Sequence, residues 1–289
     1  MNRFDPFKDD VEIQWCPGCP NFGILTAVKK AFLDLQLEPH QVCLVSGIGQ
    51  AAKLPHYVQC HFFNGLHGRA IPVALGIHAA NPELITVVTT GEGDCYGEGG
   101  NHFLHALRRN PNITVVVHNN EIYALTKGQA SPTTPPGEVR SLQVHGVEAW
   151  PLNMPAVAVL HDAAFVARGF AADPDQLKDL LVKAIRCPGL SVVEVIQPCI
   201  TWGRYPVSWY RERLRPVAPD HDPTDKAAAL RLLCEADGRF VTGVIFRGPR
   251  RQLFGERFRA ALEGKALVHM EFPSKEEVAR FLKGFLQTP

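Results

Sequence analysis

Two clusters of oxygen-bearing side chains follow neighbouring apolar runs of the sequence. Residues 91–94, Gly-Glu-Gly-Asp, follow one run, and the pair Asn-Asn at 119–120 follows the next. Residues 101–109 between them have helical spacing, so the expected order is strand, turn, helix, strand. Mg²⁺ is held by a few oxygen ligands together with phosphate oxygens, and open α/β sheets bind phosphorylated ligands where strands end. Glu92 and Asn120 therefore predict a metal-assisted phosphate site, although the same residue types also form ordinary tight turns.

A second candidate site is the pair Cys16 and Cys19, which are separated by Pro-Gly. A Cys-x-x-Cys turn brings two sulfurs together and suits a metal, an iron–sulfur cluster or a redox pair. A structural zinc site would need a second such pair at short range, and none follows in the sequence. Most of the eight cysteines are expected to be small buried hydrophobes in a reducing compartment.

The composition is that of a globular protein. Its 289 residues, 46% of them hydrophobic, suffice for one large domain or two modest ones. The formal net charge of +1 gives no electrostatic reason to expect nucleic acid or an anionic membrane as a partner. No apolar run approaches the roughly 20 residues that span a bilayer, and residues 1–6 lack the apolar region of a signal peptide. We therefore expect a cytoplasmic protein.

The order of elements predicts an α/β fold, a parallel sheet with helices on both faces. Strands are expected at 42–46, 84–90, 113–118, 165–169 and 190–196, and helices at 21–37, 68–80, 101–109 and 174–186. Residues 126–151 are rich in Gly, Pro, Ser and Thr, and a connection of this length is usually a lid or a binding loop.

The character of the chain changes after residue 205. Residues 1–205 form the predicted α/β domain, whereas residues 206–289 are more charged. Helices are expected at 225–235, 253–262 and 275–286. We interpret 206–289 as a mostly helical C-terminal extension that packs on the core or on a partner subunit.

Taken in order, the motifs resemble the β subunit of the 2-oxoacid:ferredoxin oxidoreductases, the subunit that binds thiamine diphosphate. The resemblance is carried by residues 15–19, 46–49, 65–70, 91–94, 99–103, 119–120, 125–133, 197–201 and 221–225. These segments extend over nearly the whole chain, and their co-occurrence is specific although each motif alone is weak. The turn at 125–129, Leu-Thr-Lys-Gly-Gln, is most similar to members that act on 2-oxoglutarate or on a broad range of 2-oxo acids. The resemblance implies the thiamine diphosphate-binding fold.

The resemblance also implies an activity, cofactors and partners. Enzymes of this family decarboxylate a 2-oxo acid oxidatively on thiamine diphosphate, transfer the acyl group to coenzyme A, and pass electrons singly through a [4Fe–4S] cluster to ferredoxin. The coenzyme supplies the carbanion chemistry, while the protein binds, orients and tunes it. An α subunit is the implied partner, and the acid that activates the aminopyrimidine is expected there.

Individual residues acquire roles from the resemblance. Glu92, Asn120 and the carbonyl of Ile122 would ligate Mg²⁺. The residues that would border the diphosphate and the thiazolium are Ser46, Gly47, Ile48, Gly49, Gly91, Gly93 and Asp94.

Three further residues are candidates for contact with the substrate. Lys53 and Lys127 would offer cations to the substrate carboxylates, in bonds roughly twice as strong as neutral ones. His67 would touch a phosphate or the substrate. The alternatives are that both lysines are solvated surface charges and that His67 is a turn residue bonded to the backbone.

Two positions depart from the family pattern. The family has Asp where this chain has Glu92, which still supplies a carboxylate. Three of the four cluster thiolates map to Cys16, Cys19 and Cys199, but the fourth maps to Gln50, and an amide is a poor ligand for iron that prefers thiolate.

The second departure leaves three outcomes open. A four-iron cluster could form with a non-cysteine fourth ligand or with Cys43 or Cys60, a three-iron cluster could form, or no cluster binds. Without a cluster, the chain would be a non-oxidative thiamine diphosphate-dependent decarboxylase or acyl transferase. A non-catalytic iron–sulfur or assembly subunit is a further alternative. A nicotinamide-binding domain is disfavoured, because the glycine spacing after residue 91 does not fit the dinucleotide fingerprint.

Overall fold

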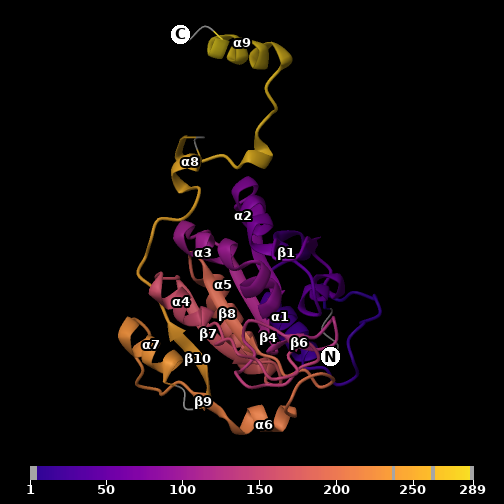
Figure 1. Cartoon of the computed structure of the whole chain (residues 1–289). Coiled ribbons are helices and arrows are strands. Elements are labelled where there is room, and N and C mark those ends of the chain that lie inside the picture. Colours follow the sequence, from indigo (N-terminus) through magenta and orange to yellow (C-terminus); the bar gives the residue numbers. More distant parts are fainter. Residues whose placement is uncertain (1–4, 236–237, 262–263, 287–289) are drawn as a thin grey trace.

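The computed structural model describes residues 5–235, 238–261 and 264–286, which are built around a central sheet (Figure 1). The sheet has eight strands in the order β2-β1-β3-β4-β8-β7-β10-β9. Neighbouring strands run parallel, except that β10 runs antiparallel to β7. The predicted α/β architecture with a mainly parallel sheet is confirmed.

The central strands are the apolar runs of the sequence. Their bounds are β1 (Val42–Ser46), β3 (Ile85–Gly91), β4 (Thr114–Asn119), β7 (Phe165–Phe170) and β8 (Ser191–Ile196). Every residue of β1 and β8 is buried. Such continuous burial is expected for parallel strands covered on both faces.

Alternate residues of the strands pack on opposite faces of the sheet. On one face, Val116 of β4 belongs to a core that α1 and α5 complete, and on the other face Val115 and Val117 belong to a core that α2, α3, α4 and α7 complete. The bounds of these helices are α1 (Asn21–Asp34), α2 (Ala70–Ala80), α3 (Gly100–Arg109), α4 (Met154–Leu160), α5 (Pro174–Arg186) and α7 (Lys226–Cys234). The prediction of helices on both faces is therefore confirmed.

The start and end of α5 follow from local sequence. The side chain of Asp173 accepts a hydrogen bond from the Gln176 amide at 3.1 Å, and Pro174 occupies the first helical position. Both are favoured at a helix N-terminus, where backbone N–H groups have no partner within the helix. Lys183 and Arg186 lie in the last turn, where positive charge stabilises the helix dipole.

Several elements were not predicted from the sequence, and three of them show why. The edge strand β2 (His61–Asn64) is exposed along its whole length, so it lacks an apolar signal. Helix α4 is short, but Asn153 caps it by accepting a hydrogen bond from Ala156 N, with proline within its first turn. Strand β10 (Phe240–Phe246) is rich in β-branched and aromatic residues, which favour a strand. We did not use this signal, because we interpreted the C-terminal region as mostly helical.

The C-terminal segment is less helical than expected, because β9 (Leu214–Pro216) and β10 extend the sheet of the first segment. The helix expected at 253–262 is the shorter α8 (Glu256–Ala261), and its predicted last residue lies outside the described ranges. The expected helix at 275–286 is α9 (Lys275–Leu286). The remaining elements here are α6 (Val207–Glu212) and the 3₁₀ turn η4 (Leu267–His269).

Helix α9 lies apart from the body of the molecule, at the end of an extended segment (Figure 1). The described part of the chain contains no helix with both the length and the apolar character needed to cross a bilayer.

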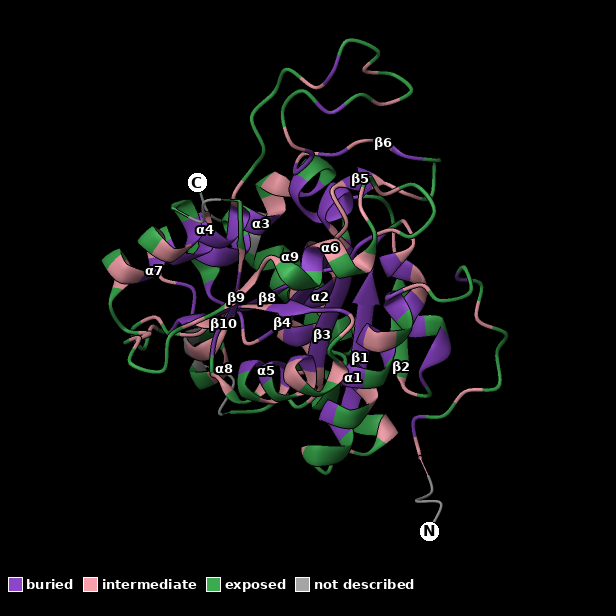
Figure 2. Ribbon diagram, turned by 90° about the horizontal axis from the view of Figure 1, so that it is seen from below, coloured by how far each residue is buried: buried purple, intermediate pink, exposed green. Residues whose placement is uncertain are grey.

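The carboxyl ends of β1, β3, β4 and β8 meet at one edge of the sheet, because these strands are parallel neighbours. Short elements cover this edge, and a long loop continues from β6 to α4 (Figure 2). The short elements are the 3₁₀ turn η2 (Ala51–Tyr57), the π-helical turn η3 (Gly93–Glu98), and the hairpin of β5 (Ile122–Tyr123) and β6 (Gln129–Ala130). The 3₁₀ turn η1 (Pro39–Gln41) lies at the opposite edge, directly before β1. The predicted loop at 126–151 thus begins beside the strand ends.

Candidate active site and thiol pocket

A cavity of about 100 Å³ lies at the edge where the parallel strands end. Its lining comes from the segments after β1 and β3, from the turn after β4, and from the start of the following hairpin. The residues that line it are Ile48, Gly49, Gln50, Ala51, His67, Gly91, Glu92, Gly93, Asp94, Asn120, Ile122, Tyr123, Ala124, Leu125 and Thr126. We call it the strand-end cavity.

Asp94 ties the loops of this cavity together. Its carboxylate accepts hydrogen bonds from the amides of Gly68 (2.7 Å) and Ile48 (3.2 Å) and from the Thr90 hydroxyl (2.6 Å). The Nδ1 atom of His67 lies 3.0 Å from the same carboxylate. Because both oxygens are already engaged, Asp94 serves the protein as an organiser of three segments and has little capacity left for a ligand.

The carboxylate of Glu92, unlike that of Asp94, is not fully hydrogen-bonded. It is 1% exposed, and its Oε1 atom is buried without a hydrogen-bond partner among the described residues. Its Oε2 atom accepts a hydrogen bond from the backbone N–H of Asn120 at 3.4 Å. Burial raises the pKa of Glu92 to about 7, against the lowering effect of hydrogen bonds from Ser131 and Asn120. A buried carboxylate with a free oxygen requires a compensating charge, which a divalent cation would supply.

The carboxamide of Asn120 is held in one orientation. Its Oδ1 accepts a hydrogen bond from Ile122 N at 3.1 Å, and its Nδ2 donates to Gln197 Oε1 at 3.2 Å. The structure thus brings Glu92, Asn120 and Ile122 together on one cavity wall. Carboxylate, amide and carbonyl oxygens are the donor set that Mg²⁺ accepts, and their role as ligands stays a prediction.

Two of the predicted glycines are required by the protein's own packing. A Cβ atom on Gly93 would lie 2.3 Å from the ring of Tyr123, and one on Gly47 would lie 2.2 Å from the Asp94 carboxylate. Gly49 differs, because a Cβ there would meet no protein atom within 4 Å, while its φ of +116° favours glycine. The open space beside Gly49 is therefore part of the cavity, where a bound group could approach the backbone.

Of the other predicted site residues, some line the strand-end cavity and some do not. The Ser46 hydroxyl is buried and engaged, since it donates to Ala52 O (2.9 Å) and accepts from Asn64 Nδ2 (2.8 Å). His67 lines the cavity, paired with Asp94. Lys53 points its Nζ toward Gln14 O at 3.5 Å, and Lys127 is exposed one residue beyond the cavity-lining Thr126. The structure does not bring the two lysines into the cavity wall.

The three predicted cluster cysteines line a second, smaller cavity of about 50 Å³, which we call the thiol pocket. Each sulfur receives a hydrogen bond: Cys16 from Thr201 Oγ1 (3.3 Å), Cys199 from Trp202 N (3.3 Å), and Cys19 from Gln197 Nε2 (3.9 Å). Burial raises the pKa of Cys19 to about 11, and the neighbouring Cys199 and Cys16 add to the rise. The three sulfurs thus share one pocket, and their role as cluster ligands stays a prediction from the family resemblance.

Gln50 lines the thiol pocket, and its Oε1 atom is buried with no hydrogen-bond partner in the described part of the chain. Cys43 and Cys60 lie elsewhere, within the cores on the two faces of the sheet. Of the alternatives for a fourth ligand, the geometry therefore favours Gln50. No three His, Cys, Asp or Glu residues of the described ranges converge on a single-ion site.

The strand-end cavity and the thiol pocket are neighbours. Gln50, Asn120 and Ala124 line both of them, so each of these residues has one side toward each cavity. Any group bound in one cavity would be separated from a group in the other by this single layer of residues.

Sequence reasoning missed a buried polar network behind the Asn119–Asn120 turn. Glu194 is 3% exposed and accepts hydrogen bonds from Arg168 Nε (2.6 Å), Asn119 Nδ2 (3.3 Å) and Tyr96 Oη (3.3 Å). It therefore supports both the segment after Glu92 and the turn that holds Asn120. An acid inside the otherwise apolar run of β8 was the signal that could have revealed it.

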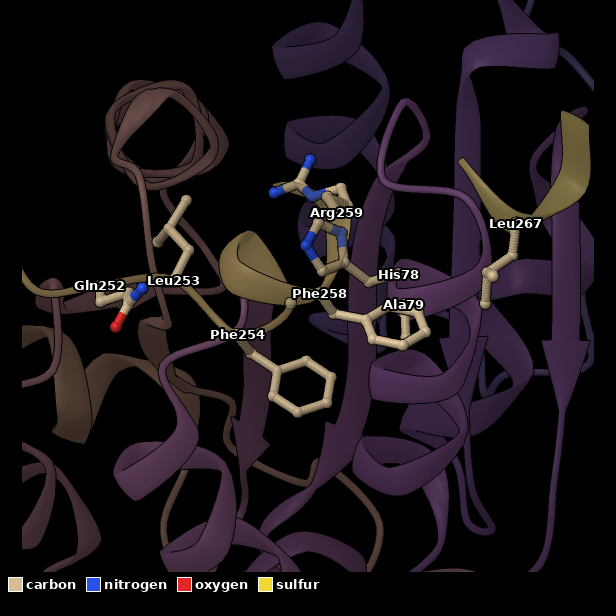
Figure 3. Close-up of a pocket in the computed structure, with 9 residues that line it drawn as sticks. His78, Ala79, Gln252, Leu253, Phe254, Phe258, Arg259 and Leu267 are labelled. Atoms are coloured by element: carbon tan, nitrogen blue, oxygen red, sulfur yellow. The ribbon is translucent and has the colours of Figure 1, made fainter. Parts of the chain in front are cut away.

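A larger cavity of about 560 Å³ lies elsewhere, between α2 and the segment around α8 (Figure 3). Its lining is mainly apolar, with Phe254, Phe258 and Leu267, and its polar groups belong to His78, Gln252 and Arg259. Both ring nitrogens of His78 are buried without partners among the described residues, and burial lowers its pKa. This cavity lies away from the strand ends where the predicted chemistry gathers.

Family comparisons agree with this geometry. The model of the family "Thiamine pyrophosphate enzyme, C-terminal TPP binding domain" matches residues 43–195. The model of the C-terminal part of the "Pyruvate ferredoxin oxidoreductase beta subunit" matches residues 199–262. The first match contains the strand-end cavity, and the second begins at Cys199 of the thiol pocket.

Individual proteins are similar along most of the chain. The protein "2-oxoacid:ferredoxin oxidoreductase 1, subunit beta" of Aeropyrum pernix is 40% identical over 264 residues, which are 87% of this chain and 83% of that protein. The corresponding β subunit of Saccharolobus solfataricus is 45% identical over 213 residues, 73% of this chain and 69% of that one. A solved structure, "2-oxoglutarate:ferredoxin oxidoreductase from Magnetococcus marinus with 2-oxoglutarate, coenzyme A and succinyl-CoA bound", has a TM-score of 0.88 and 33% identity, covering 100% of this chain and 98% of that one.

Proposed function

Since this chain belongs to the family of 2-oxoacid:ferredoxin oxidoreductase β subunits, we propose that it is the thiamine diphosphate-binding subunit of such an enzyme. The enzyme converts a 2-oxo acid and coenzyme A into acyl-CoA and CO₂, and it works together with an α subunit. The observation that carries the metal and coenzyme assignment is the buried, unpartnered Glu92 Oε1 beside Asn120 at the strand ends.

Glu92, Asn120 and the Ile122 carbonyl would hold Mg²⁺ and, through it, the diphosphate. When bound, thiamine diphosphate supplies the carbanion that attacks the 2-oxo group and stabilises the electron pair released with CO₂. The protein's part is to bind and orient. Asp94 fixes the loops after β1 and β3, and Gly49 leaves open space at the cavity wall.

A 2-oxo acid of the 2-oxoglutarate type is the substrate we infer. The structural relative from Magnetococcus marinus is described with 2-oxoglutarate, coenzyme A and succinyl-CoA bound. His67 lines the cavity, and we propose that it contacts the substrate or a phosphate. Lys127, next to Thr126 at the cavity edge, and Lys53 remain proposed cations for the substrate carboxylates, in a pocket to which the α subunit also contributes.

The thiol pocket would carry electrons out of the enzyme. Cys16, Cys19 and Cys199 present three sulfurs, and the unpartnered Oε1 of Gln50 offers an oxygen in the same pocket. We propose that these four donors hold an iron–sulfur cluster that passes electrons to ferredoxin. All eight cysteines are free thiols, in keeping with the cytoplasmic location that we infer.

The test of the function is cofactor binding and turnover with and without the α subunit. Thiamine diphosphate with Mg²⁺ is titrated into the isolated chain and into the α/β complex, followed by an assay of coenzyme A-dependent ferredoxin reduction with 2-oxoglutarate. We expect weak binding by the isolated chain, tight binding by the complex, and turnover by the complex alone. Binding in neither case would leave an assembly subunit as the better hypothesis.

The cluster has a separate test in a series at position 50. Wild type, Gln50→Cys and Gln50→Ala are purified anaerobically with the α subunit and analysed for iron, acid-labile sulfide and electron paramagnetic resonance. If Gln50 is the fourth donor, wild type and Gln50→Cys hold a four-iron cluster and Gln50→Ala holds a three-iron one. An iron-free wild type would favour the non-oxidative decarboxylase or acyl transferase.

A further inference from the structure

The side chain of Gln197 lines the thiol pocket and contacts Asn120, which lines both the thiol pocket and the strand-end cavity. Its Oε1 accepts a hydrogen bond from Asn120 Nδ2 at 3.2 Å, and its Nε2 lies 3.9 Å from Cys19 Sγ as a donor. One carboxamide therefore touches both a predicted metal ligand and a predicted cluster ligand.

This side chain has little freedom to move. Gln197 is 2% exposed, and its backbone N–H donates to Asn119 O at 2.8 Å, directly after the pairing of β8 with β4. Its Nε2 also donates to the carbonyl of Pro198 at 3.3 Å. A rigid amide whose two ends meet different partners transmits a change at one end to the other, because rotation that improves one hydrogen bond alters the second.

We propose that Gln197 is a positioning residue that couples the thiol pocket to the metal-binding turn. The inference rests on the proposed function and adds a residue to it. When Cys19 is bound to iron as a thiolate, its sulfur becomes an ionised acceptor, and hydrogen bonds to ionised acceptors are roughly twice as strong as neutral ones. The stronger bond holds Gln197, which in turn holds the Asn120 carboxamide with its Oδ1 in the ligand position.

Two consequences follow. Loading the thiol pocket with iron strengthens the binding of Mg²⁺ and thiamine diphosphate, and by linkage the bound coenzyme strengthens the retention of iron by the same factor. The donated hydrogen bond also stabilises the more negative, reduced state of a cluster, so its loss lowers the reduction potential. A residue that only fills space would produce neither effect.

The experiment compares the α/β complex in iron-loaded and chelator-stripped forms under anaerobic conditions. Affinity for thiamine diphosphate with Mg²⁺ is measured by calorimetry, and the cluster potential by redox titration. Wild type is expected to bind roughly 10-fold more tightly when loaded, which is within the range that partners of metal ligands contribute. Gln197→Leu is expected to bind equally in both forms and to have a lower potential.

Gln176→Leu is the matched control. Gln176 lies on α5 and, like Gln197, has a buried side-chain atom, but its Oε1 has no partner in the described residues. It should behave as wild type. If Gln197→Leu does not assemble, Gln197→Asn can replace it. This variant keeps the amide on a side chain one methylene shorter, and it too should bind the coenzyme equally in the loaded and stripped forms.

The outcomes separate the two proposals. Equal affinity of loaded and stripped wild type, or an undiminished difference in Gln197→Leu, would overturn the coupling while leaving the proposed function intact. A wild type that takes up no iron would overturn the coupling together with the proposed iron–sulfur cluster, but not coenzyme binding. Absence of coenzyme binding in both forms would instead remove the proposed function together with the coupling built on it.

Discussion

The strand-end cavity and the thiol pocket share a wall but are constructed differently. The cavity takes its key residues from the ends of β3 and β4, which are neighbours both in the chain and in the sheet. The thiol pocket takes its four proposed donors from three distant segments, around Cys16, at Gln50 and at Cys199. The first site follows from the fold itself, whereas the second depends on how the N-terminal turn and the segment after β8 lie against each other.

The two sites also differ in what they lack. At the strand ends one buried carboxylate oxygen, on Glu92, has no partner among the described residues, so the site needs a cation. In the thiol pocket every sulfur already has a donor, and the unpartnered atom is the neutral Oε1 of Gln50. The cavity is therefore sensitive to loss of charge, and the thiol pocket to loss of sulfur.

The largest expected effect comes from removing the charge of Glu92. Glu92→Gln keeps the shape of the side chain but cannot supply a carboxylate. Affinity for Mg²⁺ with thiamine diphosphate should therefore fall on the order of 100-fold. Loss of a residue that only hydrogen-bonds to a metal ligand already lowers metal affinity by up to about this factor. Calorimetric titration of the α/β complex measures it. Iron should remain bound, with at most the roughly 10-fold weaker retention that linkage to the coenzyme implies, because the thiol pocket does not include Glu92.

Glu92→Asp is the control for that substitution. It retains a carboxylate with one methylene less and is expected to keep most of the affinity. Equal affinity of wild type and Glu92→Gln would show that the unpartnered oxygen does not hold the metal.

The next largest effect is expected from removing a sulfur from the thiol pocket. Cys199→Ser replaces a soft sulfur by a hard hydroxyl, and iron in these clusters prefers thiolate. Bound iron and ferredoxin reduction should both be lost. Coenzyme affinity should fall only to that of the chelator-stripped wild type, because Cys199 does not line the strand-end cavity.

Cys187→Ser serves as the control, since Cys187 is a free thiol packed at the end of α5. It should retain wild-type iron. Retention of full iron content in Cys199→Ser would place the cluster elsewhere.

A third substitution separates organisation from ligand binding within the cavity. The carboxylate of Asp94 accepts hydrogen bonds from Gly68 N, Ile48 N and Thr90 Oγ1. Asp94→Asn replaces one of its oxygens by an NH₂ group, which donates and cannot accept, so at least one of these donors loses its acceptor. Leaving a buried donor unsatisfied costs about 1–3 kcal/mol. The free energy of unfolding from denaturant titration should fall by that amount, whereas Glu92→Gln should leave it equal or higher. Unchanged stability would contradict the organising role.

The difference between the sites also explains what the sequence could predict. The order of strands and helices and the closeness of Glu92 and Asn120 follow from periodicity and from the rule that parallel strands end at one edge. The convergence of Cys16 with Cys199 could be inferred only through family resemblance, because no local pattern links residues so far apart. Their approach is visible only in the folded chain, where both line one pocket.

Other features were beyond sequence reasoning for physical reasons. Asp94 was expected to border the coenzyme and does line the strand-end cavity, but the sequence could not show that backbone amides from distant loops occupy its oxygens. Gln197 belongs to a motif that the sequence singled out, but its two partners become apparent only when side chains are placed. Strand β10 was overlooked because the charged residues around it favoured a helical interpretation.

The smallest expected effect concerns a single hydrogen bond in the thiol pocket. Thr201 Oγ1 donates to Cys16 Sγ at 3.3 Å from a side chain that is exposed to solvent. Thr201→Val is nearly isosteric and removes that donor, so the reduced cluster loses a stabilising contact worth about 0.5–1.5 kcal/mol. Redox titration should show a slightly lower reduction potential with unchanged iron content and unchanged coenzyme affinity. Coenzyme affinity should distinguish Thr201→Val from Gln197→Leu. Both substitutions remove a hydrogen-bond donor to a sulfur, but only Gln197 also contacts Asn120. If Thr201→Val weakened coenzyme binding as much as Gln197→Leu, the two sites would communicate through the cluster itself and not through the carboxamide of Gln197.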